Sequence, residues 1–375
     1  MLAEVKRSGR GCSRRKGFPV KTILVSIGLT LSIVAVSAMS QARVTGQCSN
    51  CHTMHYSQGG TQLSEWGSSG PYKALTIDTC VGCHTGINTG SNTIPYVYST
   101  TEPTYGMDTL AGGNFYWVAQ GGGDAKGHNV LGIADRDVEL SGGAPGNPYS
   151  CSNSCHISLA HEHAVEGLGS GCGGCHLRPA HHAIDSDTVV GLEQADDDGY
   201  YRFLSGHMSG NNHGVAGIED SDWQYTKSAA DHNEYLGWEG HLQYRAGFYN
   251  LGHTMTAFCC GCHGDFHEEQ DSGSNWIRHP SDAVIPDSGE YAGAFGAEGG
   301  GTGTYDPLVP VARPSLSGWT EPGSSVTLGT GGDMVMCLSC HRAHGSPYYK
   351  IMRWDYKNWP GEGTNGCGVC HTSKY

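Results

Sequence analysis

The chain has 375 residues, of which only 37% are hydrophobic and 58 are glycine, and its formal net charge is −14. An acidic balance of this size argues against nucleic acid and anionic membrane surfaces as partners. The small apolar share would not offset the entropy cost of ordering an ordinary domain of this length, so part of the core must come from something other than side chains.

Residues 1–42 are predicted to be an export signal. They carry seven basic residues and one acidic residue, followed by an apolar run from Ile23 to Met39 and a small-x-small cleavage site at Ser40-Gln41-Ala42. An uncleaved membrane anchor is the alternative, but the run is short for a membrane span. Cleavage would leave residues 43–375 with 15 basic and 35 acidic residues.

The first chemical motif of the mature chain is Cys48-Ser-Asn-Cys51-His52. Cys-x-x-Cys-His is the attachment signal for a c-type haem, in which the two thiols form thioethers and the His takes one axial position on the iron. A zinc half-site or a thioredoxin-like pair is the alternative for a single Cys-x-x-Cys. Neither requires a His directly after the second Cys.

The same pattern recurs six more times, always with His after the second thiol, which favours haem over zinc. One of these sites has a spacer with one extra residue, and another has Cys260 inside its spacer. The seven sites predict seven covalently attached haems c, with thioethers at Cys48, Cys51, Cys80, Cys83, Cys151, Cys155, Cys172, Cys175, Cys259, Cys262, Cys337, Cys340, Cys367 and Cys370, and proximal ligands at His52, His84, His156, His176, His263, His341 and His371.

On these motifs the chain resembles the multihaem c-type cytochromes with doubled Cys-x-x-Cys-His motifs of metal- and sulfur-reducing bacteria. The Cys-His-x-x-His extensions at His52/His55 and His341/His344, and the sequence Cys340-His-Arg-Ala-His-Gly-Ser, strengthen this resemblance. The resemblance covers the chain from Cys48 onwards. Some members of this wider group form extracellular filaments.

Fourteen further histidines are available for the second axial position of each iron. His55 and His344 lie one helical turn after a proximal His and therefore on the same helix face, so each must serve a neighbouring haem. The simplest neighbours are the haem of Cys80/Cys83 for His55 and that of Cys367/Cys370 for His344. His267, four residues after His263, is read in the same way.

Four more distal ligands are predicted from their surroundings. His128, His213 and His279 lie in loops marked by Gly or Pro, which can approach a haem face closely, and His182 is preferred to its neighbour His181. The choice stays open among further histidines, with His207 and His253 first in reserve, followed by His161, His163, His232 and His241.

We predict a mostly irregular fold with short α-helices and little or no β-structure, in which the chain wraps a stack of seven haems. Residues 43–375 would form a single body, with haem pairs at 48–84, 151–176 and 337–371 and a single haem at 259–263. Glycine-rich composition predicts loops at 111–123 and 296–314. Residues 194–199 match only part of a calcium loop, because Ser205 stands where a Glu is needed, so an acidic turn is favoured.

The predicted function is electron transfer through seven bis-histidine haems, and the chain is not expected to be an enzyme. It would act in the periplasm, at the cell surface or outside the cell, toward an extracellular acceptor such as a mineral or electrode. The expected partners are other redox proteins or copies of itself, with a conductive filament as one form of assembly. The alternative is a multihaem oxidoreductase of the nitrogen- or sulfur-oxyanion reductase type. Its open catalytic haem would be sought at the irregular Cys151 motif.

The intact mass of the mature protein should show seven haem additions, because seven motifs supply both thiols and a ligand. Mass spectrometry of the purified protein measures this number directly. Six additions would indicate that the Cys151–Cys155 site is unmodified, and two or three would contradict the haem interpretation.

Overall fold

The computed structural model describes residues 47–53, 57–58, 61–62, 80–140, 159–160, 171–176, 200–204, 214–239, 253–263, 279–358 and 365–373. Residues 43–375 group into one unit by their contacts. Within the described ranges, no helix has the length and apolar character needed to cross a membrane. The division into a signal and a mature chain remains a prediction.

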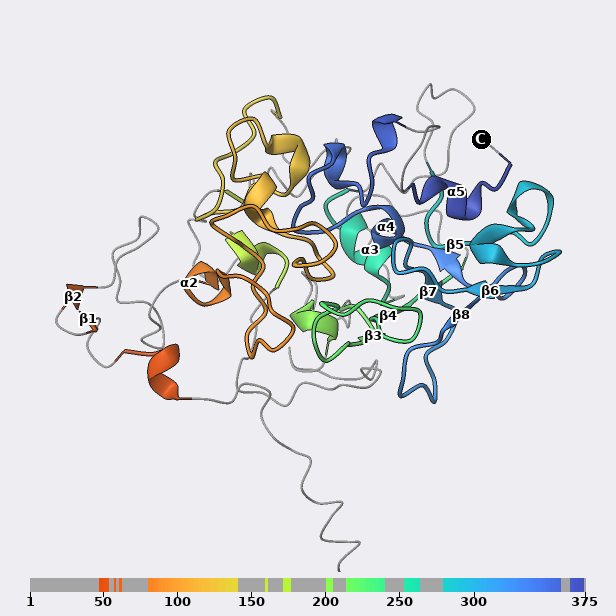
Figure 1. Cartoon of the computed structure of the whole chain (residues 1–375), viewed down its shortest axis with the longest axis horizontal. Helices are drawn as coiled ribbons and strands as arrows, with labels where there is room; N and C mark the ends of the chain where they lie inside the picture. Colours follow the sequence, from red (N-terminus) through yellow and green to blue (C-terminus); the bar gives the residue numbers. More distant parts are fainter. Residues whose placement is uncertain are drawn as a thin grey trace, which may run out of the picture. The chain divides into compact units, whose positions relative to one another are not determined.

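Regular structure in the described ranges is short. The α-helices are α2 (Cys80–His84), α3 (Met255–Cys260), α4 (Cys337–Cys340) and α5 (Cys367–Cys370). The 3-10 helices are η1 (Cys48–Asn50), η3 (Phe115–Trp117), η4 (Asp124–Lys126), η6 (Gly171–Gly174), η7 (Tyr201–Phe203), η9 (Gly289–Tyr291), η10 (Ala294–Gly296), η11 (Tyr349–Ile351) and η12 (Tyr356–Asn358). The predicted coil-rich fold with short helices is confirmed (Figure 1).

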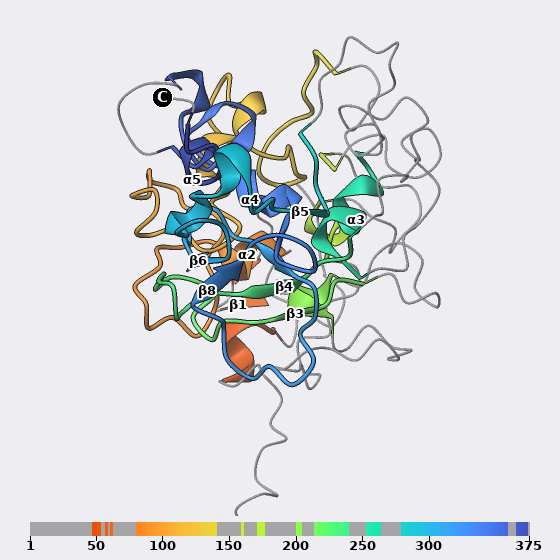
Figure 2. The same ribbon diagram turned by 90° about the vertical axis from the view of Figure 1, so that its right-hand side faces the viewer.

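The strands have two or three residues each. They are β1 (Ser57–Gln58), β2 (Thr61–Gln62), β3 (Gly217–Ile218), β4 (Glu234–Leu236), β5 (Ala283–Val284), β6 (Thr302–Thr304), β7 (Ala312–Arg313), β8 (Ser325–Thr327) and β9 (Met334–Val335). Five of them form a sheet in the order β3-β4-β7-β9-β5, in which only the β4–β7 pair is parallel. Strands β6 and β8 pair separately and lie side by side in Figure 2.

The loop predicted at 296–314 is wrong in part, because β6 and β7 lie within it. Their partners are distant in sequence: Gly303 of β6 faces Val326, and Ala312 of β7 faces Tyr235. Composition reports local turn preference, whereas these pairings depend on long-range contacts. The loop predicted at 111–123 contains one element, η3, whose start is capped by the Asn114 side chain.

An ion-pair network lies buried in the middle of the five-stranded sheet. Arg313 on β7 donates from Nε to Glu234 Oε2 of β4 over 2.7 Å, and from Nη1 to Asp333 Oδ2 over 2.7 Å. All three side chains are buried. The Arg313 guanidinium and the His232 imidazole lower the pKa of Glu234 although burial raises it, so the carboxylate stays charged and paired.

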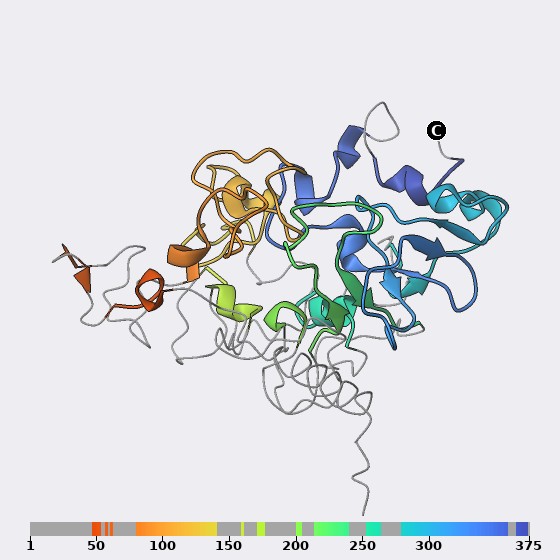
Figure 3. The ribbon, with the colours of Figure 1, turned by 60° about the horizontal axis from the view of Figure 1, so that its bottom comes forward.

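Three apolar clusters lie among the described residues, and each contacts cysteines of the haem motifs. The cluster around Ile285 and Val326 contacts Cys340, Cys367 and Cys370. The cluster around Tyr235 contacts Cys175 and Cys259, and it places α3 against the central strands β4, β7 and β9 (Figure 3). A third cluster, around Phe115, contacts Cys172. The side-chain core therefore reaches the sites where haem would be attached.

Replacing Arg313 with Met should destabilise the haem-loaded protein by about 3–5 kcal/mol, since it leaves two buried carboxylates without their cation. Guanidinium-induced unfolding measures the loss. Arg136→Met, at a half-buried arginine whose guanidinium donates only to a backbone carbonyl, is the control and should be near neutral. Equal effects of the two substitutions would contradict the role given to the network.

Candidate haem-binding sites

Six of the seven motifs lie within the described residues, and each lies on a short helix or at its end. The backbone N–H of the motif His bonds the carbonyl of the first Cys in five of them: 2.8 Å at His52, 2.9 Å at His176 and His263, 3.1 Å at His341 and 2.8 Å at His371. This helical turn places both thiols, three residues apart, on one face. The sequence Cys-x-x-Cys-His thus folds locally into the form that attachment to two vinyl groups needs.

Cys151, Cys155 and His156 lie outside the described residues, as do four predicted distal ligands, His55, His182, His213 and His267. The reserve histidines His161, His163, His181, His207 and His241 and the acidic turn at 194–199 also lie outside them. Cys260 is described and is buried within α3.

In three proximal histidines, Nδ1, the ring nitrogen that would face away from iron, lies close to a backbone carbonyl oxygen. The distance is 2.9 Å from His84 to Pro95 O, 2.8 Å from His176 to Arg202 O and 3.0 Å from His341 to Lys350 O. An Nδ1–H that donates to a carbonyl fixes the tautomer and orients the ring, leaving the Nε2 lone pair for a metal. At His371 the corresponding neighbour is a carboxylate oxygen of Glu290, 3.5 Å from Nδ1.

Two predicted distal ligands and one reserve histidine share this arrangement. The Nδ1 atom lies 2.6 Å from Ala343 O in His128, 2.9 Å from Pro280 O in His279 and 2.9 Å from Gly214 O in His253. The structure therefore favours His253 over the other described reserve, His232, in the order predicted from the sequence.

His232 is not suited to iron. Its Nδ1 lies 3.2 Å from Ser228 O, its Nε2 lies 3.1 Å from Glu234 Oε1, and its ring stacks on Tyr305 with centroids 3.5 Å apart. Both ring nitrogens are occupied by partners within the protein, so this His belongs to the buried ion network.

Three predicted distal histidines lie opposite proximal ones. The ring centroids are 6.1 Å apart for His128 and His263, 6.2 Å for His344 and His176, and 6.2 Å for His279 and His371. Metal–imidazole nitrogen bonds of about 2 Å, with about 1.1 Å from nitrogen to ring centre, put two axial imidazoles about 6 Å apart. The side chains present therefore fit an iron held by two histidines.

The geometry favours a neighbour for His344 other than the predicted Cys367/Cys370 motif. His344 lies beside His176, and His279 lies beside His371. That His344 serves a haem other than that of His341 stays a prediction. The choice of the Cys367/Cys370 haem assumed that the nearest motif in sequence is the nearest in space.

His344 is enclosed by the glycine-rich segment that precedes η3. Phe115 stacks on the His344 ring with centroids 4.8 Å apart. The backbone N–H of His344 donates to Gly112 O over 2.7 Å. A Cβ on Gly112 would lie 2.7 Å from His344 Nδ1. Burial lowers the pKa of His344 to about 3, so the imidazole is neutral at physiological pH, as metal binding requires.

Among the described motifs, thiols of each lie close to those of the next described one along the chain. A hydrogen bond with Cys80 raises the pKa of Cys172, and one with Cys337 raises the pKa of Cys259. Burial and the nearby Cys262 raise the pKa of Cys175 to about 12.

The pKa of Cys340 is also raised to about 12, by burial and by the nearby thiols of Cys367 and Cys370. Helices α3 and α4 are in contact and lie side by side (Figure 1). The five described motifs from Cys80 to Cys370 are thereby neighbours in chain order, with the Cys151 motif, which falls between Cys83 and Cys172 in sequence, outside the described residues.

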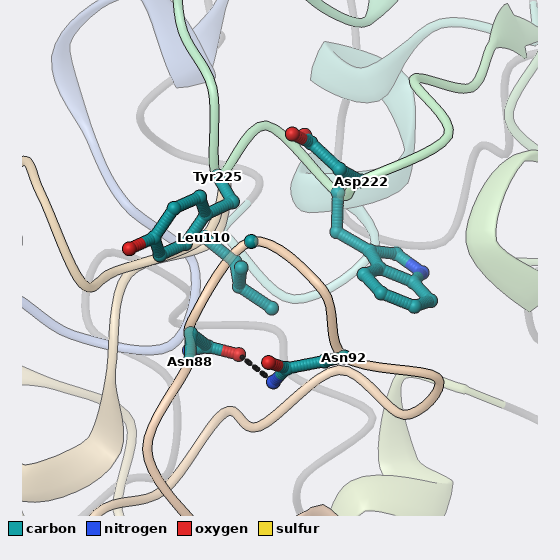
Figure 4. A pocket seen from close by; sticks show the side chains of 7 residues that line it. Asn88, Asn92, Leu110, Asp222 and Tyr225 are labelled. Atoms are coloured by element: carbon teal, nitrogen blue, oxygen red, sulfur yellow. Dashed lines mark hydrogen bonds between the residues drawn. The ribbon is translucent and has the colours of Figure 1, made fainter.

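One small cavity in the described part of the chain lies apart from these motifs. It has a volume of about 10 Å³ and is lined by Asn88, Asn92, Leu110, Asp222 and Tyr225 among others. Figure 4 shows the Asn92 amide donating to Asn88 across it, over 3.0 Å. A space of this size holds about one water molecule and no organic substrate.

Comparison with known proteins supports the sequence interpretation. Residues 41–89 and 330–375 match the family described as doubled CXXCH motif. The C-type cytochrome OmcS of Geobacter sulfurreducens is 26% identical over 399 residues, which cover 91% of this chain and 86% of that protein. These two matches confirm the predicted resemblance to multihaem c-type cytochromes and support covalently bound haem c.

Two solved structures are also similar. One is described as the Outer Membrane Cytochrome S Filament from Geobacter sulfurreducens, with a TM-score of 0.46 and 20% identity. The other is described as OmcS nanowires from the same organism, with a TM-score of 0.41 and 22% identity. Each comparison covers 84% of both chains.

Replacing Gly112 with Ala should displace the His344 ring, because the new methyl group would overlap its Nδ1 and Cε1 atoms. We expect one haem's share of the low-spin signal to become high-spin in electron paramagnetic resonance. Gly121→Ala is the matched control in the same segment, since a Cβ there meets nothing within 4 Å. An unchanged spectrum of Gly112→Ala would show that His344 is not an iron ligand.

Proposed function

We propose that the chain carries single electrons along a row of seven haems c, each iron held by two histidines. The observation that carries the proposal concerns the five described motifs from Cys80 to Cys370: thiols of each lie beside those of the next described motif along the chain. When bound, haem iron alternates between the ferric and ferrous states and so accepts and releases one electron.

The protein's contribution is to fix the ligands and exclude water. We assign the axial pairs His263–His128, His176–His344 and His371–His279, and keep His52, His84, His156 and His341 as proximal ligands whose partners are unassigned. His55, His182, His213 and His267 stay distal candidates, joined by His253. Neutral imidazoles fixed by carbonyl acceptors need little rearrangement when the charge of the iron changes.

An enzyme with an open iron is the competing function. It would require one haem with a free axial position, and the Cys151 motif is where it would be sought. The three imidazole pairs argue against an open iron at the motifs of Cys172, Cys259 and Cys367. Electron transfer without catalysis is therefore favoured.

We further propose assembly into a homopolymer outside the cell. Haems ordered along the chain would place the first and last at opposite ends of the row, so copies joined head to tail would continue it. A heterologous contact that does not close produces a filament. The similarity in sequence to OmcS supports this proposal. The excess of acidic residues opposes it by mutual repulsion of the copies.

Carbon monoxide tests the carrier against the enzyme. The fully reduced protein should bind none, because six-coordinate iron offers no free position, and its optical spectrum should stay low-spin in both redox states. A bis-histidine cytochrome of similar haem number is the positive control for full ligation. Stoichiometric carbon monoxide binding to one haem in undamaged protein would favour the oxidoreductase.

Electron microscopy of material released from cell exteriors tests assembly separately. Filaments labelled by an antibody against this chain are expected. Compact particles alone, together with a monomer in sedimentation at high salt, would leave the carrier intact and remove the filament.

A further inference from the structure

We propose that Arg353 binds a propionate of the haem attached at Cys337 and Cys340, with Arg342 as a second positive charge beside it. The inference rests on the proposed haem loading. It adds a binding role and a control of reduction potential for two residues that no haem motif includes.

Arg353 is held directly against α4. Its backbone N–H donates to Cys340 O over 2.8 Å, and its Nε donates to Leu338 O over 2.6 Å. Both acceptors belong to the Cys337–Cys340 motif. The guanidinium is thereby fixed beside one haem attachment site by two bonds, which leaves its Nη atoms to face other groups.

Arg342 directly follows the ligand His341 in the chain. An isolated antiparallel bridge pairs His341 with Met352, and the backbone N–H of Arg342 donates to Ile351 O over 2.9 Å. Lys350 O, in the same segment, accepts from His341. The segment 350–353 therefore orients the ligand, contains Arg353 and holds the backbone of Arg342.

Both guanidinium groups are buried without a carboxylate. Arg353 is 2% and Arg342 4% exposed, and neither forms an ion pair within the described ranges. Arg342 donates from Nε to Tyr105 and from Nη1 to the carbonyls of Leu110 and Ala111. Arg353 Nη1 lies 3.3 Å from Pro307 O, and its Nη2 is buried with no acceptor among the described residues.

Arg313 is a buried arginine that does have carboxylate partners, and it serves for comparison. It is also 2% exposed, but it bonds the carboxylates of Glu234 and Asp333. A buried cation without an anion costs several kcal/mol, so a structure that keeps two such groups side by side calls for an anionic partner. Arginine forms its strongest hydrogen bonds with carboxylates.

Haem supplies that anion, because each macrocycle carries two propionates that become part of the protein once the thioethers form. Either of two haems could provide this carboxylate. The structure favours the propionate of the haem at Cys337/Cys340, because the Arg353 guanidinium lies near both Cys340 and His341. A propionate of the next haem, at Cys367/Cys370, is the other source.

A fixed positive charge beside a haem favours the reduced state, which carries one positive charge less. Removing it should lower that haem's potential. In Arg353→Gln we expect one haem's share of the absorbance change to move to lower potential. The change in its reduction equilibrium should be about tenfold, or about 59 mV for one electron.

Spectroelectrochemical titration of the haem-loaded protein measures this shift. Arg353→Lys keeps the positive charge but loses the planar guanidinium, and its haem potential should stay near that of the wild type. Arg342→Gln should lower the potential of the same haem. Arg136→Gln removes the same charge at a site whose guanidinium donates only to Leu140 O, so it should leave all potentials unchanged.

The outcomes separate this inference from the proposed function. Unchanged potentials in Arg353→Gln, in protein that still carries low-spin haems, overturn the inference and leave electron transfer standing. Wild-type protein without low-spin haem would overturn both.

If Arg353→Gln does not mature, a density map of the loaded wild-type protein decides. Arg353 Nη2 within hydrogen-bond distance of a propionate of the haem at Cys337/Cys340 supports the proposal. A carboxylate of the chain, a propionate of the neighbouring haem, or no anion at that atom overturns it.

Discussion

The structure depends on one local constraint, the helical turn that holds two thiols and a histidine in fixed relation. In the described motifs a backbone bond from the His N–H to the first Cys carbonyl closes this turn, as at His52 and His371. It needs only five residues and no distant partner. A chain with little apolar content can therefore form its attachment sites first and build the remaining structure around them.

The rest of the fold supports these turns. All three apolar clusters reach motif cysteines, and the central sheet packs on α3 through Tyr235, Ala312 and Met334. The sheet contains its own closed charge network around Arg313. Arg342 and Arg353 differ from it, because neither guanidinium has a carboxylate partner among the described residues. On the proposal above, the charge of Arg313 serves the fold and that of Arg353 serves the cofactor.

Sequence predicted what is local and missed what is not. The motifs, their short helices and the coil-rich fold follow from spacing and composition. The nearness of His344 to His176 did not, because His176 lies 168 positions earlier in the chain and only folding brings the two ring centroids to 6.2 Å. The sequence ranked His253 ahead of His232 among the reserves, but only the structure gives the reason: both ring nitrogens of His232 are occupied, whereas His253 has its Nδ1 against a carbonyl.

The central claim is that every iron would lie between two neutral imidazoles. Near-infrared magnetic circular dichroism of the fully oxidised protein tests it most directly, because the charge-transfer band of a low-spin ferric haem depends on its two axial ligands. The account predicts bands of the bis-histidine class alone, with intensity equal to the full haem content. A band of the histidine–methionine class, or a high-spin contribution equal to one haem or more in undamaged protein, would contradict it.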